Sequence, residues 1–88
     1  MNIALKEGLL IQKVVDEIVI LEPESGDYYT LNEMGAIMLE QLQQGQSVDE
    51  ITVKISQAFD VKETAVKQDF THLLTELQKH GLAHHQAT

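Results

Sequence analysis

The fold is decided within residues 26–38, which are Gly26-Asp27-Tyr28-Tyr29-Thr30-Leu31-Asn32-Glu33-Met34-Gly35-Ala36-Ile37-Met38. A strand pattern changes into a helix pattern there within one residue. The aromatic, β-branched and aliphatic side chains of residues 28–31 suit a half-buried strand. Asn32 ends that strand, and its amide oxygen can accept from the free N–H groups at a helix start. The apolar residues that follow recur at helical spacing, so a core helix is predicted to follow an edge strand without a linker.

Two apolar runs precede this stretch. Residues 9–15 form the first run, the polar pair Asp16 and Glu17 can turn the chain, and residues 18–21 form the second run. Two short strands around a tight polar turn predict an antiparallel hairpin, and the almost unbroken apolar second strand is expected to be central. Residues 22–27 contain the only proline and a glycine, so they predict the turn into the third, edge strand.

Two helices are predicted directly after Asn32. The first spans about residues 33–43 and ends near Gly45, a residue type suited to the end of a helix. Ser47 and Glu50 have the spacing of a capping box, so the second helix is expected to start there. Its apolar stripe is predicted to consist of Val48, Ile51, Ile55, Ala58 and Phe59.

The third helix has the strongest amphipathic pattern in the chain. Asp60 with Glu63 three residues later predicts its N-terminal cap, and His80-Gly81 predicts its end. Its apolar stripe consists of Val66, Phe70, Leu73, Leu74 and Leu77. Residues 84–88 have nothing to bury and are expected to fray.

The element order is therefore βββααα with loops of only a few residues. Eighty-eight residues are enough for one small domain and too few for two. One face of the sheet must be buried against the helices, so we expect a single α+β domain over residues 1–88, ordered from about residue 8 to residue 82.

The composition of the chain limits the classes of partner that we expect. The net charge is −8, there are six lysines and no arginine, and there is no cysteine. Phosphate backbones and anionic membranes attract basic proteins, so nucleic acid and membrane partners are disfavoured, and a peptide or protein with basic or apolar character is favoured. The absence of cysteine and of a signal-like or membrane-spanning run leads us to expect a cytoplasmic protein.

Several segments, taken together and in order, resemble the PqqD family of small peptide-recognition proteins. The matching residues are Val19-Ile20-Leu21-Glu22-Pro23-Glu24, Leu31-Asn32, Gly45-Gln46-Ser47-Val48-Asp49-Glu50-Ile51, Phe59, Asp69-Phe70-Thr71-His72-Leu73-Leu74-Thr75-Glu76-Leu77 and Gly81-Leu82. The resemblance covers about residues 14–82. It implies a winged-helix-like module in which a three-stranded antiparallel β-meander precedes three α-helices, without catalytic activity and without a cofactor.

The resemblance also implies a partner and a site. Family members bind a ribosomally made precursor peptide, in pyrroloquinoline quinone or related biosynthesis, and present it to a modifying enzyme, often of the radical S-adenosylmethionine type. The peptide is implied to add as a strand to strand three, in the groove against helix three. The implied peptide-binding residues are Asp27, Tyr28, Tyr29, Thr30, Leu31, Val66, Asp69, Phe70, Leu73 and Leu77.

Physical reasoning adds a constraint to this mode of binding. Ordering a peptide costs roughly 1–2 kcal/mol per backbone residue, whereas a main-chain hydrogen bond returns only about 1 kcal/mol net. Side-chain anchors must therefore supply much of the affinity. Tyr28 and Tyr29 point to opposite faces, so only one of them can line the helix side, and the sequence leaves open which one.

The sequence gives weaker support for a metal site or for an enzyme. His72, Glu76 and His80 share one helix face at i, i+4 and i+8, but a solvated face is a more common reason than zinc for this spacing, and no metal site is expected. No nucleophile or phosphate-loop motif indicates an enzyme.

Two rival functions remain to be separated by experiment. A winged-helix transcriptional regulator would need a basic recognition helix, whereas helix three carries Lys67 and Lys79 against Glu63, Asp69 and Glu76. A structural subunit that pairs through the same edge strand would be a homodimer, whereas the peptide-binding protein could be a monomer.

Overall fold

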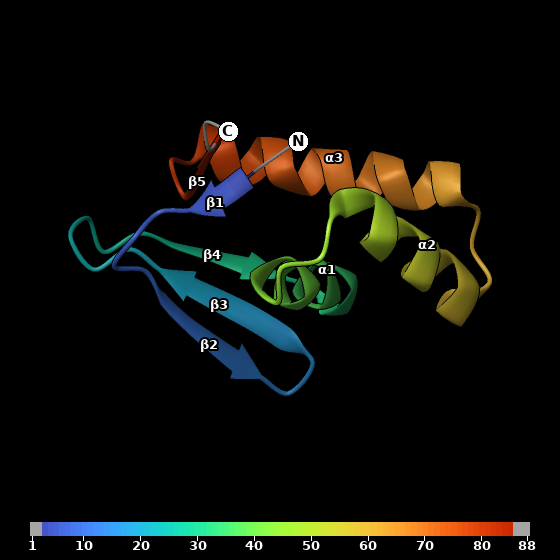
Figure 1. Ribbon diagram of the computed structural model, residues 1–88. Helices are drawn as coiled ribbons and strands as arrows, with labels where there is room; N and C mark the ends of the chain where they lie inside the picture. Colours follow the sequence, from blue (N-terminus) through green and yellow to red (C-terminus); the bar gives the residue numbers. More distant parts are fainter. Residues whose placement is uncertain (1–2, 86–88) are drawn as a thin grey trace.

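The computed structural model describes residues 3–85. Its elements are β1 (Ile3–Leu5), β2 (Leu10–Val14), β3 (Glu17–Leu21), β4 (Tyr28–Leu31), α1 (Glu33–Gln43), α2 (Val48–Phe59), α3 (Glu63–Lys79) and β5 (Ala83–His85) (Figure 1). The predicted α+β class, with three antiparallel strands followed by three helices, is confirmed by β2 to α3. The additional strands β1 and β5 lie at the two ends of this series.

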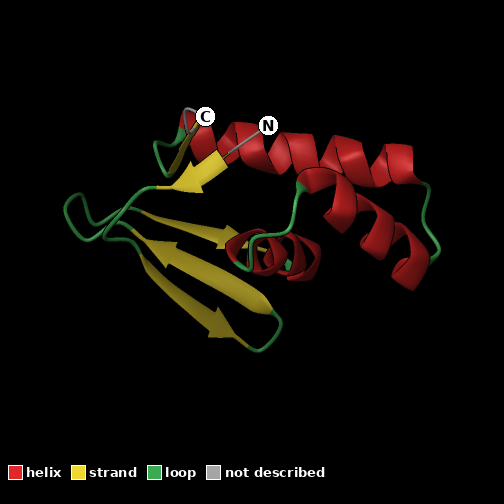
Figure 2. Cartoon of the chain, viewed as in Figure 1, coloured by secondary structure: helices red, strands yellow, loops and turns green. Residues whose placement is uncertain are grey.

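The three-stranded sheet has the order β2-β3-β4, so β3 is central and β4 is an edge, as predicted. Ile18 and Ile20 of β3 are buried, and α1 packs against β3 and β4. The helices lie on one side of this sheet (Figure 2). The alternation along β3 explains this arrangement, because every second side chain of a strand points to the same face.

The predicted N-terminal caps of α1 and α2 are both confirmed. The Asn32 side chain accepts from the Gly35 N–H at 2.9 Å at the start of α1. The capping box at α2 is complete, since the Glu50 N–H donates to Ser47 Oγ and the Ser47 N–H donates to Glu50 Oε1. These bonds satisfy N–H groups that have no partner within the helix. The β4–α1 junction is therefore fixed by its own sequence.

The predicted cap of α3 at Asp60 is wrong. Asp60 instead ends α2 with a left-handed backbone at φ 53°, and Lys62 precedes α3 without a side-chain cap. Aspartate is one of the few residue types that tolerate this conformation, which is also common at helix ends. The end of α3 was predicted correctly, because Gly81 has a φ of 73° and the Leu82 N–H donates back to the Leu77 carbonyl at 2.8 Å.

The second helix buries a different stripe from the one predicted. Ile51, Thr52 and Ile55 are buried, whereas Ala58 and Phe59 are exposed. The Thr52 hydroxyl donates to the Val48 carbonyl at 2.8 Å, so its polar group is satisfied within the helix. The last turn of α2 therefore carries an aromatic side chain that the core does not cover.

The ends of the described chain meet in a second sheet that the sequence did not predict. β1 pairs antiparallel with β5, with Ile3 opposite His85 and Leu5 opposite Ala83. The expected fraying from residue 84 is therefore wrong for His84 and His85, and residues 86–88 lie outside the described residues. Ala83 and the neighbouring Leu82 are buried in the main core, which gives this short pairing a reason to form.

The β2–β3 turn lies one residue earlier than predicted, at Val15 and Asp16, because Glu17 already belongs to β3. Val15 has a φ of 59° and is 85% exposed. A β-branched residue rarely adopts a positive φ, because its side chain is crowded by the backbone. The turn therefore contains local strain that no buried contact of Val15 offsets.

Replacing this strained valine should stabilise the protein. We expect Val15→Asn to raise the free energy of unfolding by about 1 kcal/mol, since asparagine tolerates the left-handed region. Urea denaturation of the two proteins measures the difference. Val14→Asn is the matched control, because Val14 is exposed on the adjoining strand and asparagine is a poorer strand residue than valine. Equal or lower stability of Val15→Asn would contradict the strained turn.

Candidate functional site

The open edge of β4 can be identified from one hydrogen bond and the strand register. The Glu22 N–H donates to the Asp27 carbonyl at 2.8 Å, and β4 continues from there with Tyr29 opposite Ile20 and Leu31 opposite Ile18. Bonded and non-bonded pairs alternate along an antiparallel ladder. Tyr29 and Leu31 therefore bond to β3, and the main-chain groups of Tyr28 and Thr30 point to the open edge.

A bulge sets this register. Glu22 lies opposite both Gly26 and Asp27, because its carbonyl accepts from the Gly26 N–H at 2.8 Å while its N–H donates to Asp27. Gly26 has a φ of 79°, which glycine adopts without steric cost in a bulge of this kind. The Asp27 N–H donates to Ser25 Oγ at 3.2 Å. The loop before β4 is thus ordered by its own polar groups.

The side chains of β4 alternate between two environments. Leu31 is buried and Tyr29 half-buried on the face toward the helices, whereas Thr30 and the 73% exposed Tyr28 lie on the other face. The Tyr29 ring lies 5.2 Å from the ring of His80, at the end of α3, with an angle of 48° between the ring planes. Tyr29 is therefore the tyrosine that lies against α3.

Two hollows follow β4 along the side that faces α3. The turn-end hollow, of about 590 Å³, is lined by Lys6, Glu22, Glu24, Ser25, Asp27, Tyr28, Tyr29, His80, Gly81 and Leu82. The cap-end hollow, of about 290 Å³, is lined by Tyr29, Thr30, Leu31, Asn32, Met34, Gly35, Met38, Asp69, His72 and Leu73. Tyr29 belongs to both linings, so the two hollows adjoin at this residue, and we call them together the β4 groove. In the ribbon, β4 lies between β3 and α3 (Figure 1).

The groove brings together seven of the ten residues predicted for the site. Asp27, Tyr28 and Tyr29 line the turn end, and the others line the cap end: Thr30, Leu31, Asp69 and Leu73. The remaining three, Val66, Phe70 and Leu77, are buried in the core behind it.

Sequence reasoning missed other residues of the lining. His72 comes from α3 and His80 directly follows it, Met34 and Met38 come from α1, and Lys6 comes from the segment after β1. The spacing of His72 and His80, two turns apart on one helix face, was the available signal, but it was interpreted only as a possible zinc site and not as the wall of a groove. Lys6 gave no signal, because its place depends on the pairing of β1 with β5.

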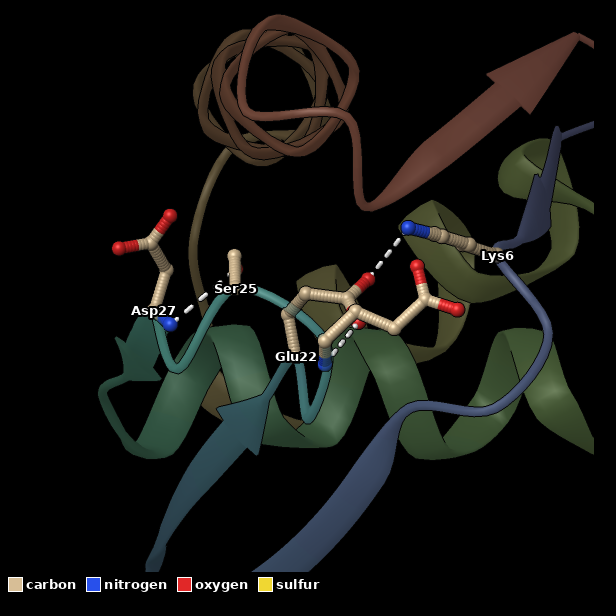
Figure 3. Close-up of polar contacts among 5 residues, drawn as sticks. Lys6, Glu22, Ser25 and Asp27 are labelled. Atoms are coloured by element: carbon tan, nitrogen blue, oxygen red, sulfur yellow. Dashed lines mark hydrogen bonds and ion pairs between the residues drawn. The ribbon is translucent and has the colours of Figure 1, made fainter.

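An ion pair fixes the turn end of the groove. Lys6 Nζ lies 2.5 Å from Glu22 Oε2, and the Glu24 N–H donates to Glu22 Oε1 at 3.0 Å, so both carboxylate oxygens of Glu22 are engaged (Figure 3). The bond from Lys6, with that from the Glu24 N–H, holds the pKa of the Glu22 carboxyl below its ordinary value, and the bond to Glu22 raises the pKa of Lys6. The carboxylate of Asp27 points away from this pair (Figure 3).

These shifts predict the pH dependence of stability. Because the Glu22 pKa is lowered, its carboxylate stabilises the fold above pH 4.5, and this stabilisation is lost as the pH falls below that value. Because the Lys6 pKa is raised, its ammonium group stabilises the fold below pH 10.5, and this stabilisation is lost at higher pH. Between these limits Glu22→Gln should therefore lower the melting temperature, and the deficit should shrink at pH 3. Thermal melts at pH 7 and pH 3 measure it, with exposed Glu7→Gln as control. A deficit that does not change with pH would contradict the assignment.

The groove is acidic apart from this ion pair. Glu24, Asp27 and Asp69 line it, and none of these carboxylates forms an ion pair within residues 3–85. The potential inside the groove therefore favours a ligand with basic or neutral side chains.

The histidine face of α3 does not form a metal site in the described chain. His72 Nε2 and His80 Nε2 lie 4.0 Å and 3.9 Å from the two carboxylate oxygens of Glu76, which is longer than a hydrogen bond. Residues 3–85 contain no cluster of three acidic, histidine or cysteine side chains that could hold a metal ion. Within the same residues, no helix has the length and apolarity needed to cross a membrane.

The chain is similar to known proteins in both sequence and fold. The family model described as Coenzyme PQQ synthesis protein D (PqqD) matches residues 17–83. No curated protein matches the chain. Among solved structures, TbiB1 in complex with the TbiA(beta) leader peptide is 24% identical with a TM-score of 0.85 over 100% of both chains. Lasso peptide synthetase B1 complexed with the leader peptide is also 24% identical, with a TM-score of 0.88 over 96% of this chain and 99% of that one. These two likenesses show that the fold is shared.

Proposed function

This chain belongs to the PqqD family, and we propose on that basis that it is a non-catalytic recognition protein for a ribosomally made precursor peptide. The peptide adds as a strand to the open edge of β4 and lies in the β4 groove against α3. The protein then presents it to a modifying enzyme, such as one of the radical S-adenosylmethionine type, in the biosynthesis of pyrroloquinoline quinone or of a related peptide product.

One observation carries this proposal: the main-chain groups of Tyr28 and Thr30 point to an open strand edge that borders an acidic, partly apolar groove. An unpaired edge is a ready template for another strand, and proteins usually blunt such edges with charge or proline. β4 contains neither a charged residue nor a proline. The open edge therefore suits strand addition.

Side-chain anchors must add to the ladder, because main-chain bonds alone do not offset the ordering of a peptide. The cap-end hollow offers apolar walls from Tyr29, Leu31, Met34 and Leu73. Two methionines there, Met34 and Met38, can adapt their shape to different side chains. We expect an apolar peptide side chain in this hollow and basic or neutral side chains near Asp27 and Glu24.

The two similar structures support binding of a precursor peptide, since each was solved with a leader peptide bound. At 24% identity the peptide of this chain need not share their sequence. The charge of the groove is the better guide to its composition.

Fluorescence anisotropy tests the function directly. Synthetic, fluorescein-labelled peptides are made for every short open reading frame beside this gene and titrated with the full chain. We expect one of them to bind with a Kd of about 10 µM or tighter, which corresponds to roughly −7 kcal/mol, and a scrambled peptide of the same composition to bind at least tenfold more weakly. Equal binding of the true and scrambled peptides would show only charge attraction and would overturn the proposal.

The same preparation distinguishes the rival functions. Salt-sensitive binding of duplex DNA would indicate a transcriptional regulator instead. A mass of two chains in solution, measured without peptide, would indicate that a second copy occupies the β4 edge.

A further inference from the structure

The β4 groove continues past the end of the strand to an aromatic side chain that the core leaves uncovered. Phe59, in the last turn of α2, is 46% exposed, although its spacing from Ile51 and Ile55 places it on the buried stripe of that helix. It lines a hollow of about 260 Å³ together with Asn32, Glu33, Met34 and Ile37. We call this the Phe59 hollow.

The Phe59 hollow and the cap-end hollow are adjacent. Asn32 and Met34 line both of them. A chain that leaves the β4 groove at its cap end therefore passes from one hollow into the other across these two residues.

Main-chain pairing cannot extend to this place. Beyond Leu31 the chain turns into α1, where the Asn32 carbonyl accepts from the Ala36 N–H at 2.8 Å and the Asn32 side chain accepts from the Gly35 N–H. The strand edge thus ends at the cap. Any peptide residue beyond it must be held through its side chain.

We propose that the precursor peptide has a second anchor, an apolar side chain that enters the Phe59 hollow from the segment leaving the β4 groove at Asn32. This inference rests on the proposed function and extends it to residues outside the strand. The occupant is aliphatic or aromatic, because Phe59, Met34 and Ile37 form the walls. Glu33 is the only charged residue of the lining, so the residues next to the anchor are basic or neutral rather than acidic.

The place of the second anchor in the peptide follows from the geometry of the strand. An added strand advances about 3.3 Å per residue, and alternate side chains face the helices. The anchor for the Phe59 hollow must therefore lie just outside the paired residues. A peptide that stops at the end of the paired strand lacks it.

Two peptides and two protein variants test the inference. The probe is the peptide that binds in the anisotropy experiment, made at full length and also truncated to the residues that pair with β4. Phe59→Ala should weaken binding of the full-length peptide about tenfold and leave the truncated peptide within about twofold, since buried aromatic anchors are frequent binding hot spots. Val53→Ala is the matched control, because Val53 is 39% exposed on the same helix and lines neither hollow.

The outcomes separate the anchor from the function. If the truncated peptide binds and Phe59→Ala leaves both affinities unchanged, the second anchor is wrong and strand addition stands. If no peptide binds the unmodified protein in the anisotropy experiment, both the proposed function and the second anchor are wrong. A peptide-side change guards against a folding defect of the variant: replacing the apolar flanking residue by aspartate should cost the full-length peptide the same tenfold with the unmodified protein. No loss in that case would also overturn the anchor.

Discussion

Thr30→Pro is expected to weaken binding of the precursor peptide by roughly tenfold or more, because it removes the N–H that β4 offers at its open edge and places a ring in the path of the added strand. The bonds from β4 to β3 come from Tyr29 and Leu31, so the sheet itself loses none. Proline is tolerated on edge strands when its position faces away from the neighbouring strand. The substitution thus removes the proposed contact with little damage to the fold. Fluorescence anisotropy with the labelled peptide measures the loss.

The opposite edge of the same sheet provides the control. β2 is joined to β3 by a two-residue turn, so Val14 and Glu17 form a bonded pair and the N–H of Lys13 faces outward. Lys13→Pro therefore makes the same change on the other open edge, at the cost of one exposed ion pair with Glu40. It should leave peptide affinity unchanged. Equal losses from the two prolines would mean that the β4 edge is not the binding edge.

Phe70→Ala is expected to lower the free energy of unfolding by about 3–5 kcal/mol, a large part of the roughly 5–10 kcal/mol of a domain this small. Phe70 has an exposed fraction of 0% and lies in the core with Ile20, Met38 and Leu39. Removing its ring leaves a cavity that the surrounding side chains fill only in part. Urea denaturation at 25 °C measures the loss, with His72→Ala as an exposed control on the same helix, expected within about 0.5 kcal/mol of the unmodified protein.

This variant also separates two roles for the apolar face of α3. Phe70, Val66 and Leu77 were predicted as peptide contacts, and they are buried behind the groove. Phe70→Ala should therefore weaken binding only as far as it unfolds the protein. Unchanged stability together with lost binding would restore Phe70 as a direct contact.

The sequence predicted the elements that have strong local signals. Asn32 marks the β4–α1 junction, Ser47 and Glu50 mark the start of α2, and Gly81 marks the end of α3, and each signal is a hydrogen bond or a backbone conformation available to only a few residue types. The central place of β3 followed from its apolar run. Such features need no knowledge of the rest of the chain.

Features that depend on distant contacts were not predictable in this way. β1 and β5 are three residues each and form only because the two ends of the described chain meet. Asp60 could serve as a cap for α3 or as a left-handed end for α2, and local sequence does not decide between them. The uncovered position of Phe59 likewise depends on where α2 ends relative to α1.

The lining of the β4 groove was predictable on its strand side and only partly on its helix side. A period of two fixed the opposite orientations of Tyr28 and Tyr29, and the packing of Tyr29 against His80 then decided which one faces α3. On α3, the apolar stripe marks the buried face but cannot distinguish the core from the wall of a groove. Leu73 of that stripe lines the groove, together with Asp69 and His72 at the border of the stripe.

Hydrogen exchange of single amides tests strand addition most directly. The Tyr28 and Thr30 N–H groups lie on the open edge, whereas those of Tyr29 and Leu31 already bond to β3. On saturation with the precursor peptide, nuclear magnetic resonance should show amide exchange that is slower by roughly tenfold or more at Tyr28 and Thr30. Exchange at Lys13, on the opposite edge, should not change. Peptide binding that leaves Tyr28 and Thr30 exchanging as fast as in the free protein would contradict the account.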